Sequence, residues 1–459
     1  MSTISSNNII NNNPIPATKS YEELLTNSIQ LLKFSNKPQN FKTNILVIGG
    51  SYAGLSAIRA LQLNLTSKLK ELKQTNSQKK ISITLIEPRN GFLNILGIPK
   101  CIVDLKFSET QYIPFNKLDH LRFNHIISNN QKFDDSWYVN NLEEWSNFIE
   151  INYVQGECTF LDTTIAKYKL NTTTPEQEDP KIENLIGEIE YDFVIMASGR
   201  DRNWPTTPKS QTFEIFQNEM SNAYNKISEA ETISVIGAGA VGIEIAGDIA
   251  TKFPQKCINL IHPHDLFPNE PLSVEFKTMV QESIEKCGVN IYLNTRIAKE
   301  ESNGNLTTTT DKIINSNLNI WCNSKYNNLQ YLSKSLQNQF ISSTNQIQTN
   351  EYLQLDNSIL TIPYFFVLGD LVNFPIIKSA GWAAFFGRQT SNNITSLIFD
   401  GIVVEPIPDL SSMPRGMVLV GGNDEIISEL AGDVSLNHEG YKKEYLDYCI
   451  GKVRATLDL

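Results

Sequence analysis

The sequence predicts an α/β protein that contains two β–α–β units of the Rossmann type and a small C-terminal α+β region. Two observations predict this class. An apolar segment, a glycine-rich turn and a helical pattern follow one another at Gly49 and again, far along the chain, at Gly237. Two further apolar segments end in small residues, at Gly199 and at Gly369–Asp370. Parallel strands joined by helices, with glycine turns at the strand ends, are the pattern of doubly wound sheets.

Length, composition and charge limit the class of protein. A chain of 459 residues has room for two or three domains of about 100–200 residues each, and 41% of its residues are hydrophobic. The formal net charge of −11 disfavours binding to nucleic acid, which needs a basic surface. We find no apolar run that spans a bilayer and no secretory signal, so we expect a cytoplasmic protein. Peripheral contact with an intracellular membrane stays open.

The order of segments predicts where the domains begin and end. Residues 1–20 are polar and Asn-rich, which is typical of disorder, and the pattern of 21–34 predicts a short helix. Ser2 excludes the N-myristoylation signal. We expect an N-terminal segment, the first part of one dinucleotide-binding domain, a second such domain, the return segment of the first domain and a C-terminal region (1–42, 43–204, 205–345, 346–400 and 401–459).

The first glycine turn departs from the usual fingerprint at one position. A strand over 44–48 runs into Gly49 and Gly50, and a helix continues from Gly54. Ser51 stands where the G-x-G-x-x-G fingerprint has its second glycine. Serine is small, so a pyrophosphate can still approach, and its hydroxyl can donate to a phosphate oxygen. The alternative is an ordinary glycine-rich turn without a ligand.

Glu87 ends the next predicted strand of this unit. An acid at that place binds the ribose hydroxyls of an adenosine. Glu87 lies farther from the turn than the usual spacing of about 20 residues, because the connecting helix and its polar extension are long. Its position supports a nucleotide site at the first turn, whereas the alternative is a carboxylate on the surface.

The second turn carries the full G-x-G-x-x-G pattern, in Gly237, Gly239 and Gly242. The first glycine allows the tight turn, the second lets the backbone approach a pyrophosphate, and the third lets the helix pack on the strand. The helix N-terminus then offers free N–H groups and a partial positive charge to the phosphates. We therefore expect a second nucleotide site here.

His262 stands at the strand end of the second unit, about 20 residues after Gly242, where the fingerprint has its acid. A carboxylate there favours NAD and repels the 2′-phosphate of NADP, so its absence leaves NADP(H) open. Asp265 lies close by and weakens this inference. The alternative is that His262 and His264 are both exposed loop residues.

The order of these motifs resembles a known family. A glycine turn, an A-T-G-like strand ending at Gly199, a second glycine turn and a G-D strand follow one another in flavoproteins of the glutathione-reductase type. The resemblance covers roughly residues 43–400. It implies that the first unit binds FAD and that the second unit binds NAD(P)H.

Within that superfamily, the chain is similar to apoptosis-inducing-factor-like proteins of the AMID type. The similarity lies in "GGSYAGLSA", "NGFLNILGIPKCIVD", "VIGAGAVGIEIAGDI", "GDLVNFPIIKSAGWAAFFGRQTSNNI" and the tail "VVEPIPDLSSMPRGMVLVGGNDEI". In that group a small residue in place of the second glycine is familiar, so Ser51 is compatible with an FAD site. The chain departs from the family pattern at 322–324, where a second A-T-G-like turn is expected.

The resemblance implies a role for each motif residue. Lys378 falls near the isoalloxazine edge and Glu244 near the nicotinamide, so these two are the expected catalytic residues. For Lys378 the alternative is a lysine at a helix start that faces water. The residues expected on FAD are Gly49, Gly50, Ser51, Gly54, Glu87, Gly199 and Asp370. Those expected on NAD(P)H are Gly237, Gly239, Gly242 and, from the strand-end argument, His262.

The resemblance implies a flavoprotein oxidoreductase that moves a hydride from NAD(P)H through FAD to a small electron acceptor. The six cysteines form no C-x-x-C pair and no zinc spacing, so we expect neither a metal site nor disulfide reduction. A quinone or a similar oxidant is the expected acceptor. The alternative is a redox-sensing or pro-apoptotic signalling flavoprotein with slow turnover.

Overall fold

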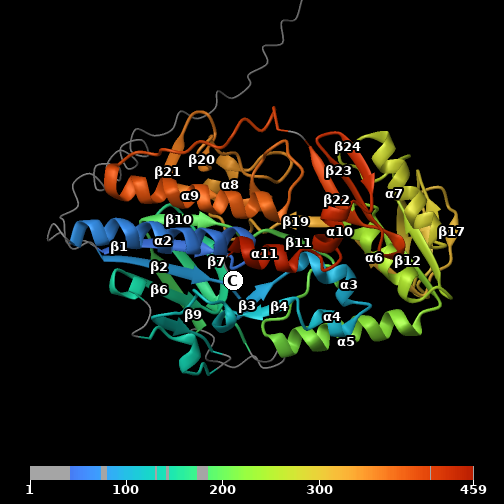
Figure 1. The fold of residues 1–459 in the computed structure, drawn as a ribbon, viewed down its shortest axis with the longest axis horizontal. Coiled ribbons are helices and arrows are strands. Elements are labelled where there is room, and N and C mark those ends of the chain that lie inside the picture. Colours follow the sequence, from blue (N-terminus) through green and yellow to red (C-terminus); the bar gives the residue numbers. More distant parts are fainter. Residues whose placement is uncertain are drawn as a thin grey trace, which may run out of the picture.

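The computed structural model describes residues 42–73, 80–129, 132–140, 144–172, 185–413 and 415–457. The Asn-rich segment and the helix predicted over 21–34 lie outside the described residues. Figure 1 shows a larger sheet with two long helices in one half of the molecule and a smaller sheet in the other half. The predicted α/β class with two Rossmann-type sheets is confirmed. The exact domain boundaries stay a prediction.

The larger sheet has the strand order β20-β21-β10-β1-β2-β6-β5. Every neighbouring pair is parallel except β20 with β21. The carboxyl ends of β1, β2, β10 and β21 therefore meet at one edge of the sheet. The strands are β1 (Lys42–Ile48), β2 (Lys80–Ile86), β5 (His125–Ile127), β6 (Ile149–Val154), β10 (Phe193–Met196), β20 (Gln354–Asp356) and β21 (Thr361–Val367).

Two long helices, α2 (Tyr52–Lys73) and α9 (Ala380–Asp400), lie side by side along the larger sheet (Figure 1). Their contact is close because small residues line it. A Cβ on Gly387 would lie 2.5 Å from the Ala53 carbonyl oxygen. The Ser391 hydroxyl, also on α9, donates to the Ala57 carbonyl at 2.8 Å. The segment that follows the second unit is thus packed against the first helix of the chain.

The smaller sheet is parallel throughout and has the order β14-β13-β12-β18. Its strands and helices are β12 (Thr232–Ile236), α6 (Ala240–Lys252), β13 (Cys257–Ile261), α7 (Val274–Lys286), β14 (Asn290–Tyr292) and β18 (Leu318–Trp321). The β–α–β order predicted on both sides of Gly237 is therefore confirmed. The polar stretch of 300–350 contains strands, as expected, and also the helix α8 (Lys334–Phe340).

The C-terminal region pairs a small sheet with two short helices, as the sequence predicts. The antiparallel strands β22 (Gly416–Val420), β23 (Ile426–Leu430) and β24 (Asp433–Leu436) pack against α6 and α7. Helix α10 (Glu439–Tyr445) follows, and α11 (Ile450–Leu457) then packs against α2 and α9 of the other half. The last helix lies between the two halves in Figure 1.

The remaining elements connect these layers. They are β3 (Gly91–Leu93), η1 (Ile95–Gly97), α3 (Ile98–Cys101), α4 (Leu105–Ser108), β4 (Tyr112–Pro114), η2 (Phe115–Lys117), η3 (Asp135–Trp137), η4 (Glu144–Asn147), β7 (Gly156–Leu161), β8 (Ile165–Leu170), β9 (Ile186–Glu190), β11 (Arg200–Arg202), α5 (Phe213–Glu229), β15 (Ile297–Glu300), β16 (Leu306–Thr308), β17 (Ile313–Ile314), β19 (Ser324–Asn327), η6 (Gly369–Leu371) and η7 (Gly422–Asp424). Strand β11 pairs with β19, and so joins the segment after β10 to the segment after β18.

Candidate dinucleotide sites

The first glycine turn lies at the carboxyl end of β1, and its glycines are sterically required. Gly49 has φ +106°, and a Cβ there would lie 2.3 Å from the Ala197 carbonyl oxygen. A Cβ on Gly54 would lie 1.8 Å from the Gly49 carbonyl oxygen. Helix α2 therefore begins in direct contact with the turn, and Ser51 comes directly before its first residue. This arrangement directs the first N–H groups of the helix to the strand edge, where an anion binds.

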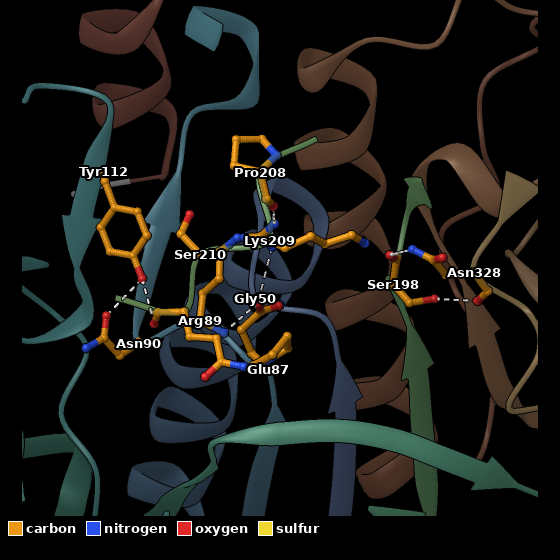
Figure 2. Close-up of polar contacts among 12 residues, drawn as sticks. Gly50, Glu87, Arg89, Asn90, Tyr112, Ser198, Pro208, Lys209, Ser210 and Asn328 are labelled. Carbon is orange, nitrogen blue, oxygen red and sulfur yellow. Dashed lines mark hydrogen bonds and ion pairs between the residues drawn. The ribbon is translucent and has the colours of Figure 1, made fainter. Parts of the chain in front are cut away.

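Glu87, at the end of β2, is bonded to the same turn (Figure 2). Its carboxylate accepts hydrogen bonds from the Gly50 N–H at 2.7 Å and from the Arg89 N–H at 3.0 Å. The side chain is only 5% exposed. The alternative of a surface carboxylate is therefore wrong. Glu87 holds the turn in shape and keeps further acceptor lone pairs on its carboxylate oxygens.

Arg89 is a neighbour of this site that the motif analysis does not identify. Its guanidinium lies 3.5 Å from the Glu87 carboxylate and donates to the Pro208 carbonyl at 2.8 Å. Its buried Nε has no hydrogen-bond partner within the part of the chain that the structure describes. Figure 2 shows the side chain between Glu87 and the loop that contains Pro208. A lone arginine in a loop gives no motif signal, although its place two residues after a strand-end acid is a usable clue.

The ends of β10 and β21 complete the edge beside the first turn. Gly199 has φ +67°, and a Cβ built there would meet no atom within 4 Å. Ser198 exchanges hydrogen bonds with Asn328, which fixes this strand end (Figure 2). Asp370 follows Gly369, and its partly exposed carboxylate accepts no hydrogen bond from the described residues. The strand ends thus present free space and an available acceptor at the edge where α/β proteins bind ligands.

Lys378 and Arg202 place positive charge near Asp370. The Lys378 ammonium is half-buried and donates to the Val372 carbonyl, so the alternative of a lysine that faces water is wrong. Burial lowers the pKa of Lys378 to about 8, opposed by Asp370 and assisted by Arg200. Burial also lowers the pKa of Arg202, again opposed by Asp370. The motif analysis does not identify Arg202, because its position on β11 depends on tertiary pairing.

The second glycine turn has the same construction as the first. Gly237 has φ +108°, and a Cβ on Gly242 would lie 1.9 Å from the Gly237 carbonyl oxygen. Gly239 is the N-cap of α6, and a Cβ there would enter open space. The backbone of Cys322, at the end of β18, lies beside Gly237. The departure from the family pattern at 322–324 therefore leaves this turn intact.

His262 lies next to the second glycine turn. It is 5% exposed, and its Nδ1 accepts a hydrogen bond from the Ala238 N–H at 3.3 Å. Burial, together with the neighbouring His264, lowers the pKa of His262 to about 4. The ring is therefore neutral at pH 7, with its proton assigned to Nε2, and this buried nitrogen has no partner among the described residues. The alternative of an exposed loop residue is wrong for His262 and right for His264.

Glu244 lies on α6 in the turn that follows Gly242. One of its carboxylate oxygens accepts a hydrogen bond from the Val420 N–H at 3.5 Å. Burial raises the pKa of Glu244 well above its usual value, and the nearby Asp248 raises it further. Both effects favour the protonated form of Glu244, and a protonated carboxyl group can donate a proton.

The family described as pyridine nucleotide-disulphide oxidoreductase matches residues 43–385. The chain belongs to this family. It is an NAD(P)H oxidoreductase that uses FAD and NAD(P)H. Both glycine turns lie within the matched residues, each at the carboxyl end of a parallel strand.

The relatives agree with the family. Oxidoreductase OXR1 of Ajellomyces capsulatus is 26% identical over 83% of this chain and 80% of its own length. Apoptosis-inducing factor homolog B of Dictyostelium discoideum is 23% identical over 78% of this chain and 81% of its own. The resemblance to apoptosis-inducing-factor-like proteins is therefore confirmed.

Solved structures show the same fold. NDH2 of Plasmodium falciparum in complex with NADH superposes with a TM-score of 0.62 at 14% identity, over 91% of this chain and 97% of that chain. An NAD-dependent persulfide reductase from A. fulgidus superposes with a TM-score of 0.57 at 18% identity. This chain covers 63% of the length of the persulfide reductase, and that match covers 84% of this chain.

The structure also describes the state of the cysteines, the grouping of possible metal ligands, and the length and hydropathy of the helices. All six cysteines are free, and no group of three or more His, Cys, Asp or Glu side chains there is arranged to hold a metal ion. Of the helices described, none has both the length and the hydropathy needed to cross a membrane. Cys101 and Cys449 are buried, whereas Cys257 is exposed.

Proposed function

We propose that this chain is an FAD-dependent NAD(P)H oxidoreductase that reduces a quinone or a similar small acceptor. The observation that carries the proposal is the pair of glycine turns, each with a buried strand-end side chain that accepts a hydrogen bond from the turn. Two complete dinucleotide sites in one chain suit a donor cofactor and a resident redox cofactor. We infer the class of acceptor from the chemical state of the cysteine thiols.

The proposed FAD site lies at the carboxyl edge of the larger sheet, and the proposed NAD(P)H site at that of the smaller sheet. Bound FAD supplies hydride and electron chemistry that no side chain provides. The residues proposed to hold FAD are Gly49, Gly50, Ser51, Gly54, Glu87, Gly199 and Asp370. Those proposed to hold NAD(P)H are Gly237, Gly239, Gly242 and His262. Lys378, with Arg202 beside it, would stabilise negative charge that develops at the redox site.

Disulfide reduction is disfavoured by the state of Cys101. Cys101 is the first cysteine that follows β2, and it is fully buried in α3. Burial raises the pKa of Cys101 well above its usual value, and Asp248 and Asp104 raise it further. Thiol–disulfide exchange requires a thiolate, so a thiol in this environment is a poor nucleophile. A small organic oxidant is the acceptor that remains.

The decisive experiment measures oxidation of NADH and NADPH by the purified yellow protein with a panel of quinones and with disulfides. We expect turnover with at least one quinone and none with disulfides. Colourless protein that cannot be reconstituted with FAD would refute the proposal. Slow turnover with every acceptor would favour the alternative of a redox-sensing or signalling flavoprotein. A cytoplasmic location, with or without membrane contact, stays a prediction.

A further inference from the structure

The turn between α10 and α11 inserts a tyrosine between the two halves of the molecule. Tyr448 is 3% exposed, and its hydroxyl donates to the carboxylate of Asp248 on α6, which is itself buried. Tyr448 and the next residue, Cys449, both have left-handed backbone conformations, at φ 53° and 60°. Non-glycine residues adopt that conformation infrequently, so neighbouring contacts must hold this turn in place.

The same turn is bonded to the first unit. The Tyr448 carbonyl accepts a hydrogen bond from the Asn94 side-chain amide at 3.0 Å. The Asn94 side-chain oxygen accepts one from the Tyr52 hydroxyl at 2.6 Å, and Asn94 is fully buried. Tyr52 is the first residue of α2, next to Ser51 of the first glycine turn. Tyr448 therefore connects α6 of one unit to the glycine turn of the other.

Asp248 and Glu244 form a row of acids along α6. They are four residues apart, so they lie on one face of the helix, and Glu244 is the nearer to the glycine turn. Burial raises the pKa of Asp248 to about 7. Because Glu244 also has a raised pKa, both groups favour the protonated form far more than exposed carboxyls do.

Six titratable groups face Asp248 from the surrounding elements: Tyr448, Lys100, Asp424, Asp104, Glu244 and Cys101. The hydrogen bond from Tyr448 and the charge of Lys100 lower the pKa of Asp248, whereas the charges of Asp424 and Asp104 raise it. Lys100 and Asp424 form an ion pair at 3.1 Å, and Asp424 is exposed. This ion pair is the partly exposed part of the charged groups around Asp248, so we take it as the side from which water supplies a proton.

The proposed reaction needs a proton that NAD(P)H does not supply. NAD(P)H gives up a hydride, which is two electrons and one proton, and becomes NAD(P)⁺. A quinone gains two electrons and two protons when it becomes a quinol. The second proton must therefore come from solvent.

We propose that Asp248, held in position by Tyr448, relays a proton to Glu244 while the acceptor is reduced. In this step the O–H bond of the Glu244 carboxyl breaks as an O–H bond forms on the reduced acceptor. Asp248 then gives its proton to Glu244 and takes one from water. Tyr448 is a positioning residue that orients the Asp248 carboxylate and stabilises its charged form. This inference rests on the proposed function.

The test compares two acceptors in the full-length holoprotein. A quinone takes up protons, whereas ferricyanide takes up electrons alone. Tyr448→Phe removes the hydroxyl and keeps the ring. Tyr445→Phe, on the same tail, is the matched control, because no hydrogen bond links the Tyr445 hydroxyl to Asp248. We expect Tyr448→Phe and Asp248→Asn to lower quinone turnover by about tenfold or more, within the range of general acid–base effects, and to lower ferricyanide turnover far less.

The pH profile gives a readout that a purely structural role would not move. Wild-type quinone turnover should fall as pH rises through about 7, where Asp248 loses its proton. Because the Tyr448 hydrogen bond lowers the pKa of Asp248, its loss in Tyr448→Phe should move this alkaline limb to higher pH.

The pH dependence of Tm tests the protonation of Asp248 without turnover. The folded state binds a proton at Asp248 more tightly than the unfolded chain does, so this group favours folding at low pH. That contribution is lost as pH rises from about 4 to about 7. Asp248→Asn should remove this component from the pH dependence of Tm, and Tyr445→Phe should preserve it.

Each outcome has one meaning. Wild-type protein that reduces neither acceptor would refute the proposed function. Active wild type with equal losses on both acceptors in Tyr448→Phe, and an unmoved alkaline limb, would refute the relay. A loss of turnover confined to the quinone reaction, together with an alkaline limb shifted to higher pH, would establish the relay.

Discussion

The two β–α–β units have the same turn but different chemistry at the strand end. In each, the N–H of the second turn residue donates to a buried side chain at the end of the following strand: Gly50 to Glu87, and Ala238 to His262. Both acceptor side chains are 5% exposed. The shared hydrogen bond supports the turn, so it cannot be what distinguishes the cofactors. The difference lies in the atoms that remain.

Glu87 keeps acceptor lone pairs and negative charge, which suit ribose hydroxyls. His262 keeps one N–H donor and no charge, because its pKa is about 4. A neutral donor accepts either a ribose oxygen or a 2′-phosphate oxygen, and it does not repel the phosphate. The comparison teaches that the two turns share one geometry and differ in the strand-end side chain, which we therefore expect to select the nucleotide.

The largest expected effect comes from breaking one turn. In Gly54→Ala the new methyl carbon would lie 1.8 Å from the Gly49 carbonyl oxygen, so helix or strand must move. We expect the variant to lose FAD. Its free energy of unfolding should fall by about 1–3 kcal/mol, as when an extra methyl group is forced into a packed core. Flavin absorbance and thermal unfolding of the purified variant check this.

Gly239→Ala is the matched control, because its methyl group would enter open space at a backbone conformation that any residue adopts. It should keep FAD and wild-type stability. Only the KM for NAD(P)H should rise, if the pyrophosphate approaches this atom as proposed. A Gly54→Ala protein with full flavin and unchanged Tm would contradict the steric argument.

The next effect concerns Asp370, which has no acidic counterpart in the second unit: β18 ends at Trp321, and Cys322 follows it. Asp370→Ala removes a carboxylate that we expect to hydrogen-bond FAD. Bonds to charged groups are worth about 1.5–3 kcal/mol, so the Kd for FAD should rise by roughly 10- to 100-fold. Titration of the apoprotein with FAD measures it. An unchanged Kd would mean that the carboxylate does not face the cofactor.

His262→Asp places a carboxylate at the strand end of the second unit, as Glu87 does in the first unit. We expect wild-type protein to accept NADPH at least as well as NADH, and the variant to shift toward NADH by repulsion of the 2′-phosphate. Because His262 is neutral above pH 5, the wild-type preference should stay constant between pH 6 and 8. Ratios of kcat/KM for both cofactors test these expectations. A strong and unaltered NADH preference would place His262 away from the ribose, with the exposed Asp265 as the next candidate.

Local patterns were enough to predict the two glycine turns, the strands that flank them and the strand-end residues. Glycines that must avoid a neighbouring carbonyl, such as Gly54 and Gly242, are visible as a spacing. Residues that act through tertiary contacts were not predicted. Arg89 and Arg202 reach the site through loop packing and through the pairing of β11 with β19.

Tyr448 was missed for a related reason. It lies 200 residues from Asp248 along the chain, and its turn has no sequence signature that links it to α6. Helix α8 escaped detection because its composition is polar, although Ser333 caps its first turn. In both cases the missing information lies in packing between distant segments, which a single sequence does not display.

The smallest expected effect tests whether the first unit contributes a thiol to the chemistry. Cys101 is fully buried among apolar residues, and burial together with two nearby carboxylates holds its pKa far above the range in which a thiolate forms. Serine is close in size, so Cys101→Ser should leave NAD(P)H:quinone turnover nearly intact. It should cost only a modest amount of stability, because a hydroxyl is less suited than a thiol to an apolar site. The exposed Cys257, in Cys257→Ser, gives the matched control, since it lies outside the apolar core. Steady-state turnover beside a thermal melt separates the two effects. A folded Cys101→Ser protein that retains FAD and has lost all turnover would show that a thiol step takes part in the reaction.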